Sequence, residues 1–150
     1  YLVQHGKSLP KEVDPDQGLS QDGISEVERI ADFAKGYAVK VSQIVHSEKT
    51  RARQTADIIA AALEPEQGVH ERRGLMPLDD VIVFSEIIDS SEALMLVGHL
   101  PFMARLTSYL ITASIDTPVF KFQNGGILCL DKDSDTGSWV IKWALMPKID

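Results

Sequence analysis

Three short apolar runs of strand-forming residues each end in a polar side chain, and this pattern constrains the fold more than any other feature of the sequence. The first run, Tyr1 to Val3, stops at Gln4-His5-Gly6; the second ends at His46-Ser47, and the third, Ala93 to Val97, ends at Gly98-His99. The first and third runs are apolar throughout, which is typical of strands buried on both faces of a parallel sheet. Because ligands bind outside the carboxyl ends of such strands, the pattern predicts one site that contains these polar residues.

Helical patterns separate the strand-like runs. Apolar spacing, capping residues and stop signals predict four helices, and two strands are predicted between them. The predicted helices are Ser20 or Asp22 to Gly36, Ser47 (as the N-cap) to about Leu63, a weaker one from Pro77 to Ser90, and one that starts at Pro101 and ends near Thr112. The second strand is expected to cover Val39 to Val45, and Val69 to Arg72 is expected to form a short edge strand.

Two more strands are predicted near the end of the chain, Gly126 to Leu130 and Ser138 to Leu145, joined by a turn. In the second of these, Trp139, Ile141, Trp143 and Leu145 alternate, which predicts one apolar face with both tryptophans in the core. The order of elements predicts an α/β fold, a three-layer α/β/α sandwich. It has helices on both faces of a mostly parallel sheet with an antiparallel C-terminal edge. We expect residues 1–150 to form one domain.

Composition excludes several classes of protein. A net charge of −7 and a pI near 5 argue against a general binder of nucleic acid or of anionic membranes. The single cysteine, Cys129, lies in an apolar run, so we expect no internal disulfide and a cytoplasmic location. No apolar run is long enough to cross a bilayer, and nothing argues for an oligomer, so a monomer is expected. Because the chain starts inside a strand without Met, a few residues are expected to precede it.

The polar strand ends combine groups that bind phosphate. Helix N-termini offer free N–H groups and a partial positive charge, and Arg51 falls in the first turn of the helix after Ser47. Because helical side chains lean toward the N-terminus, its guanidinium should point back to the strand ends and grip two phosphoryl oxygens. With His5 and His99, this makes a site for phosphoryl transfer without metal. The four histidines lack paired ligand spacing, so neither a metal nor another cofactor is expected.

With these residues in view, the chain resembles the histidine phosphatase superfamily, the phosphoglycerate-mutase-like proteins, and in particular its short SixA-type phosphohistidine phosphatase branch. Segments matching the family motifs occur in order up to about Pro101, with a family-like Gly125-Gly126 after them. The matching segments are Gln4-His5-Gly6 for Arg-His-Gly, Leu19 to Gly23 for Leu-Thr-x-x-Gly, Ser47 to Thr55 for Ser-Pro-x-x-Arg-Ala-x-Gln-Thr, and Gly98 to Pro101 for the second histidine.

The resemblance implies a role for each site residue. His5 attacks phosphorus and is transiently phosphorylated, while its other ring nitrogen donates to a backbone carbonyl. Arg51 and His99 hold the non-bridging oxygens, with Gln4 as a further phosphate contact. The substrate would be a phosphorylated protein or a small phosphorylated molecule.

Two departures from the family pattern bear on the substrate. Gln4 replaces the usual arginine, which removes a charge and a planar fork. Gly74 stands where family members often carry an acid, and none of Glu71, Asp79 and Asp80 matches that position. A missing proton donor matters less for phosphohistidine than for an ester, because imidazole is basic enough (pKa ~6.5) to leave protonated.

The spacing of the site residues also favours phosphohistidine as the substrate. Arg51 and His99 are only 48 positions apart, which leaves little room for a lid over the site and suits a phosphohistidine carried by another protein. Two alternatives stay open: a small-molecule phosphomonoesterase of the same fold, and a catalytically impaired phosphate-binding or regulatory module.

Overall fold

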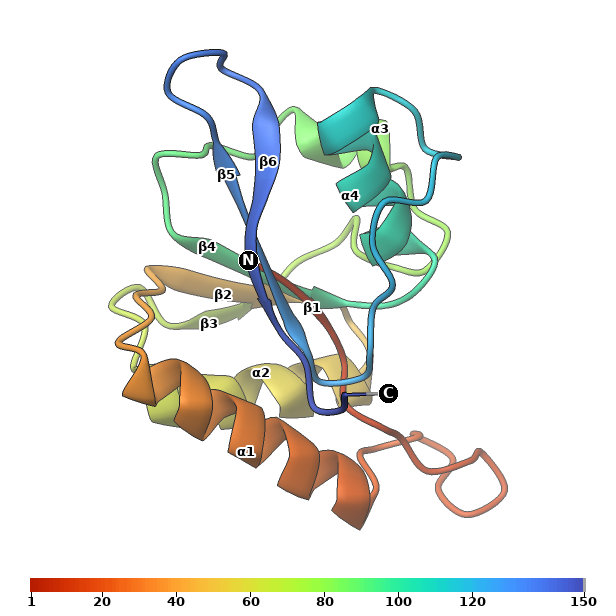
Figure 1. Ribbon diagram of the computed structural model, residues 1–150. Coiled ribbons are helices and arrows are strands. Elements are labelled where there is room, and N and C mark those ends of the chain that lie inside the picture. Colours follow the sequence, from red (N-terminus) through yellow and green to blue (C-terminus); the bar gives the residue numbers. More distant parts are fainter. Residues whose placement is uncertain (150) are drawn as a thin grey trace.

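The structure is a computed structural model that describes residues 1–149, and it forms one six-stranded sheet with helices on both faces (Figure 1). The elements alternate along the chain as β-α-β-α-β-α-β-α-β-β. In order they are β1 Leu2–Gln4, α1 Gln21–Gly36, β2 Gln43–His46, α2 Thr50–Leu63, β3 Val69–Glu71, α3 Val81–Ser85, β4 Leu94–Gly98, α4 Phe102–Thr112, β5 Ile127–Lys132 and β6 Trp139–Leu145.

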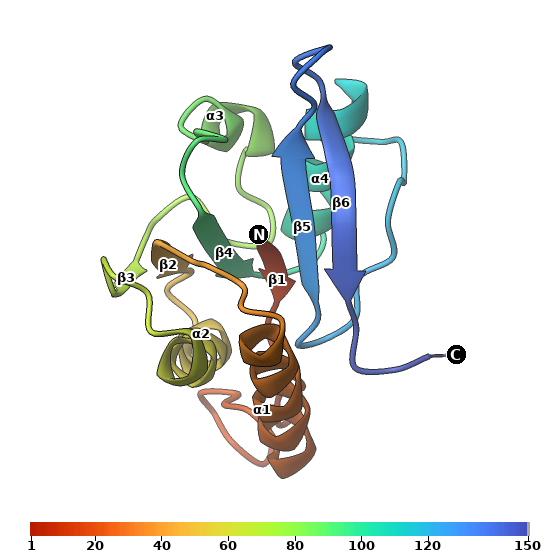
Figure 2. The same ribbon diagram turned by 60° about the vertical axis from the view of Figure 1, so that its left-hand side comes forward.

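The sheet has the order β3-β2-β4-β1-β5-β6. The pairs β3/β2, β2/β4 and β4/β1 are parallel, whereas β1/β5 and β5/β6 are antiparallel. Figure 2 shows the arrowheads of β1 and β4 at the same edge. The predicted α/β/α sandwich with an antiparallel C-terminal edge is therefore confirmed.

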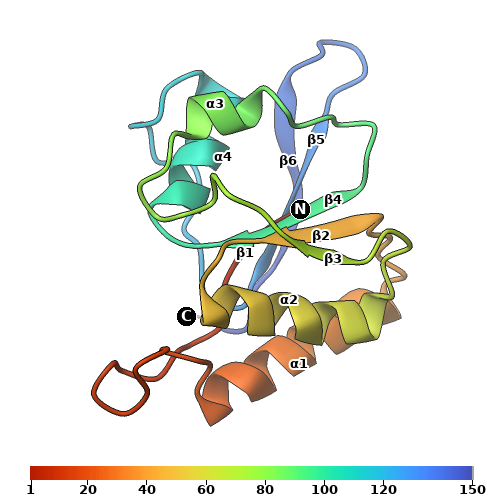
Figure 3. The same cartoon turned by 180° about the vertical axis from the view of Figure 1, so that it is seen from behind.

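Two apolar cores fill the two faces of the sheet. Helices α1 and α2 cover one face (Figure 3). On that face Val27 and Ile59 belong to one apolar cluster with Val3 and Ile44. Helices α3 and α4 cover the other, where Phe84 and Phe102 stack edge to face with ring centroids 5.7 Å apart. Neighbouring residues of each buried strand contribute to opposite cores, which explains why apolar residues follow one another directly at Leu2-Val3, Ile44-Val45 and Met95 to Val97.

Several predicted boundaries are wrong. Helix α2 begins at Thr50 with Lys49 at its N-cap, so Ser47 is not the cap. Helix α3 covers five residues rather than Pro77 to Ser90, because the side chain of Asp80 caps it and residues 77–79 form a turn. Strand β2 starts at Gln43 rather than Val39, and Pro101 is the N-cap of α4 rather than its first residue.

The predicted single apolar face of β6 is also wrong. The pairs Cys129/Trp143 and Leu130/Ile141 leave Lys142 as an extra residue, a β-bulge that reverses the alternation. Trp143 therefore packs on the core beside α1, whereas Trp139 lines a hollow with Ile88 and Leu110 on the other face. Both tryptophans are half-buried rather than fully inside.

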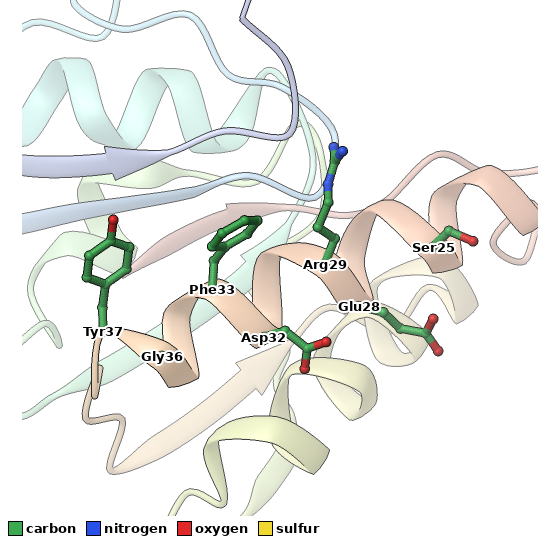
Figure 4. A pocket seen from close by; sticks show the side chains of 7 residues that line it. All are labelled: Ser25, Glu28, Arg29, Asp32, Phe33, Gly36 and Tyr37. Carbon is green, nitrogen blue, oxygen red and sulfur yellow. The ribbon is translucent and has the colours of Figure 1, made fainter.

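The C-terminal segment is attached to α1 through Arg29. The guanidinium Nη2 of Arg29 donates to the carbonyl of Pro147 at 2.6 Å, and Arg29 rises from the helix in line with Phe33 and Tyr37 (Figure 4). These side chains line a hollow of about 670 Å³ that includes none of the predicted site residues. Within residues 1–149, no helix combines the length and apolarity that crossing a membrane requires.

Candidate active site

His5 lies directly after β1, and both its backbone N–H and its carbonyl are hydrogen-bonded. Its N–H donates to the carbonyl of Gly98 at 2.9 Å, and its own carbonyl accepts from Nδ2 of Asn124 at 2.9 Å. Its ring Nδ1 lies 2.7 Å from the carbonyl oxygen of Gly6. A carbonyl can only accept, so this contact places the ring proton on Nδ1 and leaves a lone pair on Nε2.

Arg51 reaches this lone pair from the first turn of α2. Its Nε lies 3.3 Å from Nε2 of His5, so the side chain points back to the strand ends as the sequence predicts. The Thr55 hydroxyl joins the two segments, since it accepts from the N–H of Gly6 at 2.9 Å and donates to the carbonyl of Arg51 at 2.8 Å. One threonine thus fixes the loop that follows β1 against the start of α2.

His99 lies beside His5 at the end of β4. The ring centroids are 5.0 Å apart and the planes are inclined by 56°. His99 is only 2% exposed, and its Nε2 lies 2.5 Å from the hydroxyl oxygen of Ser47. Its Nδ1 is buried and has no hydrogen-bond partner among residues 1–149. A buried polar atom of this kind calls for a water or ligand atom.

Gln4 adjoins the histidines from β1. Its backbone is paired in register with Gly98, and its carbonyl accepts from the N–H of Gly125 at 2.8 Å. Its Oε1 and the Nδ1 of His99 are the two buried side-chain polar atoms left without a partner in the described part of the chain. Both belong to residues that the sequence assigns to the site.

Burial and positive charge keep both histidines neutral. Burial lowers the pKa of His5, the contact with Gly6 opposes that shift, and the charge of Arg51 adds to it. Burial lowers the pKa of His99 to about 3, with further contributions from His5, Arg51 and Lys49. Burial also lowers the pKa of the Arg51 guanidinium. At neutral pH the site therefore holds two uncharged imidazoles beside one cationic guanidinium.

The carboxylates closest in sequence to the family's acid position have other partners. Asp79 accepts from the N–H of Met76 at 2.8 Å, and Asp80 caps α3 through the N–H groups of Ile82 and Val83. Glu71 is exposed at the end of β3, and Gly74 has a left-handed backbone with φ of +92°. A proton donor for an ester leaving group is thus not evident in this segment.

Other polar residues near the motifs have structural or surface roles. Lys7 forms an ion pair with Glu26, with Nζ and Oε1 3.3 Å apart, and the Arg73 side chain is 93% exposed. His46 is buried with its Nδ1 2.8 Å from the carbonyl of Ser47, whereas His70 is exposed. No three His, Cys, Asp or Glu side chains within residues 1–149 are grouped as metal ligands would be.

The sequence interpretation missed three supporting residues. The sequence assigns Ser47 to the cap of α2, but it contacts His99; it assigns Thr55 only to the buried face of that helix, and it assigns no role to Asn124. Thr55 lies within the segment that resembles the family motif, and Asn124 directly precedes Gly125-Gly126. Their positions were visible in the sequence, but the hydrogen bonds across 49 and 119 positions were not.

Comparison with known proteins gives the same family as the motifs. Residues 1–79, more than half of the chain, match the family model of the histidine phosphatase superfamily (branch 1). The chain is 23% identical to the phosphohistidine phosphatase SixA of Escherichia coli (strain K12) over 153 residues, which cover 98% of this chain and 92% of that protein.

Solved structures show the same fold. The protein histidine phosphatase SixA in complex with tungstate superimposes with a TM-score of 0.81 at 24% identity, covering 97% of this chain and 95% of that one. A phosphoserine phosphatase of Entamoeba histolytica with 3-phosphoglyceric acid has a TM-score of 0.70 at 16% identity, covering 96% and 94%. The chain belongs to the histidine phosphatase superfamily and is similar to its SixA-type members.

Proposed function

We propose that this protein is a metal-independent phosphatase that forms a phosphohistidine on Nε2 of His5 and acts on protein phosphohistidine. One observation carries the proposal: the Nδ1 contact to Gly6 and the lowered pKa leave the lone pair of His5 on Nε2, where it faces the guanidinium of Arg51 at 3.3 Å. A neutral imidazole in this state is an effective nucleophile toward phosphorus.

In the first half of the reaction, the lone pair of His5 Nε2 forms a bond to phosphorus as the bond from phosphorus to the leaving nitrogen breaks. The bonding electrons go to the leaving imidazole nitrogen, which takes a proton from solvent water. Arg51 and His99 donate to the non-bridging oxygens, where negative charge increases in the transition state. Gln4 adds an uncharged amide contact on the same side of the site.

In the second half, water attacks the phosphorus of phosphorylated His5. The bond between Nε2 and phosphorus breaks, its electrons return to Nε2, and inorganic phosphate leaves with the oxygen of the water. The proton lost by the attacking water goes to phosphate or to solvent. His5 regains its lone pair, and the contact to Gly6 keeps the proton on Nδ1 throughout.

The surroundings of the site favour a phosphoramidate over an ester. Asp79 and Asp80 are engaged in a turn and a helix cap, and Gly74 occupies the position of the family's acid. An imidazole leaves without a dedicated proton donor, whereas an alkoxide does not. The short α3, of five residues, adds little cover above the strand ends, which suits a phosphohistidine carried on another protein.

A small-molecule phosphomonoesterase is the second candidate. The Entamoeba phosphoserine phosphatase shares the fold at 16% identity, so this scaffold also supports ester hydrolysis. A third candidate, a phosphate-binding or regulatory module, rests on the loss of the arginine at Gln4 and of the acid at Gly74.

Phosphate release without added metal separates these candidates. The substrates are a phosphohistidine peptide and an aryl phosphate ester, each tested with wild type and His5→Ala. We expect wild type to turn over phosphohistidine faster than the ester and His5→Ala to be inactive. Faster turnover of the ester would favour the phosphomonoesterase. If both proteins are inactive but bind phosphate, the protein is a binding module.

A further inference from the structure

Ser47 contacts the second histidine of the site from the end of β2. Its side chain is fully buried, its Oγ lies 2.5 Å from Nε2 of His99, and the N–H of Lys49 donates to the same oxygen at 3.4 Å. A hydroxyl carries a single hydrogen, and the described residues give Oγ no other acceptor. One lone pair of Oγ accepts from Lys49, and Nε2 of His99 is the one acceptor within residues 1–149 that the hydroxyl hydrogen can reach.

The direction of this bond decides the state of the His99 ring. If Ser47 donates, Nε2 is the acceptor and a neutral ring must carry its proton on Nδ1. The charged groups that face this ring, Arg51 and Lys49, are both cations, which opposes a second ring proton. The ring is then a neutral donor at Nδ1, the buried atom that has no protein partner.

We propose that Ser47 is a positioning residue that holds His99 in the Nδ1–H form, so that Nδ1–H donates to a phosphoryl oxygen. The inference rests on the proposed function in one respect, namely that the acceptor is the phosphoryl group bound at His5. The two histidines then share one tautomer but present opposite atoms: His5 presents the lone pair of Nε2 to phosphorus, and His99 presents a proton to oxygen. In the other tautomer, the lone pair of His99 Nδ1 would repel that oxygen.

The ring proton is directly measurable by long-range proton–nitrogen NMR of the uniformly nitrogen-15-labelled protein near pH 7. The four histidine rings are assigned by replacing His5, His46, His70 and His99 with Gln one at a time. We expect the wild-type His99 ring to show a protonated Nδ1 and an unprotonated Nε2. A protonated Nε2 in the wild type would overturn the proposal, and this result needs no Ser47 variant to fold.

Variants test whether Ser47 sets this state. Ser47→Thr keeps the hydroxyl and should keep the Nδ1–H form, whereas Ser47→Ala should shift the ring to a mixture or to Nε2–H. Ser108→Ala is the matched control: this serine is also buried, at 2% exposure, but its single hydroxyl hydrogen is shared between the carbonyls of Ser114 and Thr117, away from the site. An unchanged His99 spectrum in a folded Ser47→Ala variant would also overturn the proposal.

Binding of inorganic phosphate supplies the functional readout. We expect phosphate to shift the His99 Nδ1–H resonance of the wild type and to bind Ser47→Ala about ten-fold more weakly, the effect of losing one well-placed hydrogen bond. Ser47→Thr and Ser108→Ala should bind as the wild type does. Equal binding by wild type and Ser47→Ala would contradict the role of Nδ1–H as the donor.

The two proposals can fail separately. A wild type with Nδ1–H and a phosphate response, but without turnover, would refute the phosphatase and leave the role of Ser47 intact. An active enzyme with Nε2–H on His99 would refute the role of Ser47 and leave the phosphatase intact.

Discussion

Gly23 in the first turn of α1 lies directly against the carbonyl of Lys7, so close that an added Cβ would overlap that carbonyl oxygen. The same carbonyl accepts a hydrogen bond at 2.9 Å from the N–H of Ser20, which is the residue that caps α1. Helix α1 is therefore fixed at its N-terminus to the segment that follows His5. The absence of a side chain at position 23 is what permits this approach.

Replacing Gly23 with alanine is expected to destabilise the protein by about 1–3 kcal/mol, because backbone on both sides of the contact must shift. Chemical unfolding of wild type and variant measures the difference. Gly36→Ala, at the end of the same helix with open space around it, should be neutral or stabilising by up to about 1 kcal/mol. Equal stability of the two variants would show that the backbone at Lys7 and Gly23 can move apart at little cost in free energy.

If the proposed function holds, Arg51→Gln should lower kcat/KM by about 10²–10³-fold, because it removes the cation that the proposal places against the transferring phosphoryl group. The stability of the fold should change little, since the guanidinium makes one hydrogen bond within residues 1–149, to Nε2 of His5. Steady-state phosphate release measures the effect. Arg53→Gln, two residues on and exposed, is the control and should retain wild-type turnover. A comparable loss in both variants would indicate a general effect of charge.

Gln4→Arg should raise kcat/KM by about ten- to a hundred-fold, since a charge-assisted hydrogen bond is worth ~1.5–3 kcal/mol. The unpaired Oε1 of Gln4 means that the exchange breaks no side-chain hydrogen bond of that atom. Gln21→Arg, which adds the same charge at the exposed start of α1, controls for net charge. Unchanged or lower activity in Gln4→Arg would mean that position 4 does not contact phosphate.

The acidic limb of kcat/KM should lie below the ordinary histidine pKa of about 6.5. His5 must be unprotonated to attack, and burial lowers its pKa, so the active form persists to lower pH than for a free imidazole. A pH profile of turnover measures this limb. An acidic limb at or above pH 6.5 that is caused by protonation of His5 would contradict the lowered pKa of this residue.

The stability of the fold should fall as pH decreases from about 6.5 toward 3. The folded-state pKa of His99 is lowered to about 3, so in this range the unfolded chain binds a proton that the folded chain excludes. For one such group the free energy of unfolding falls by at most about 1.4 kcal/mol per pH unit. Above pH 6.5 this contribution is fully present. Chemical unfolding of wild type and His99→Gln across this range should show a shallower slope in the variant, and parallel curves would contradict the prediction.

Much of the architecture followed from local patterns. Apolar runs that end in His5, Ser47 and His99 identify strands buried on both faces, and the helical spacing between them dictates parallel strands with covering helices. The helix from Gln21 to Gly36 was predicted nearly to the residue, because Ser20 accepts a capping hydrogen bond from Gly23.

Errors arose where distant contacts override local preference. Ser47 has the chemistry of an N-cap, but its hydroxyl bonds to His99, 52 positions away, and α2 begins three residues later. The alternation of β6 predicts one apolar face, but the bulge at Lys142 moves Trp139 to the opposite face from Trp143. Neither partner strand nor partner side chain is encoded in the local pattern.

The sequence alone determined the family and the order of elements, and it named His5, Arg51 and His99 as the candidate site residues, because short motifs and hydrophobic periodicity are local properties of the chain. Tertiary structure decided which ring nitrogen each histidine presents and how strongly burial favours the neutral rings. Those properties depend on the carbonyl of Gly6, the hydroxyl of Ser47 and the exclusion of water, which exist only once the strand ends meet.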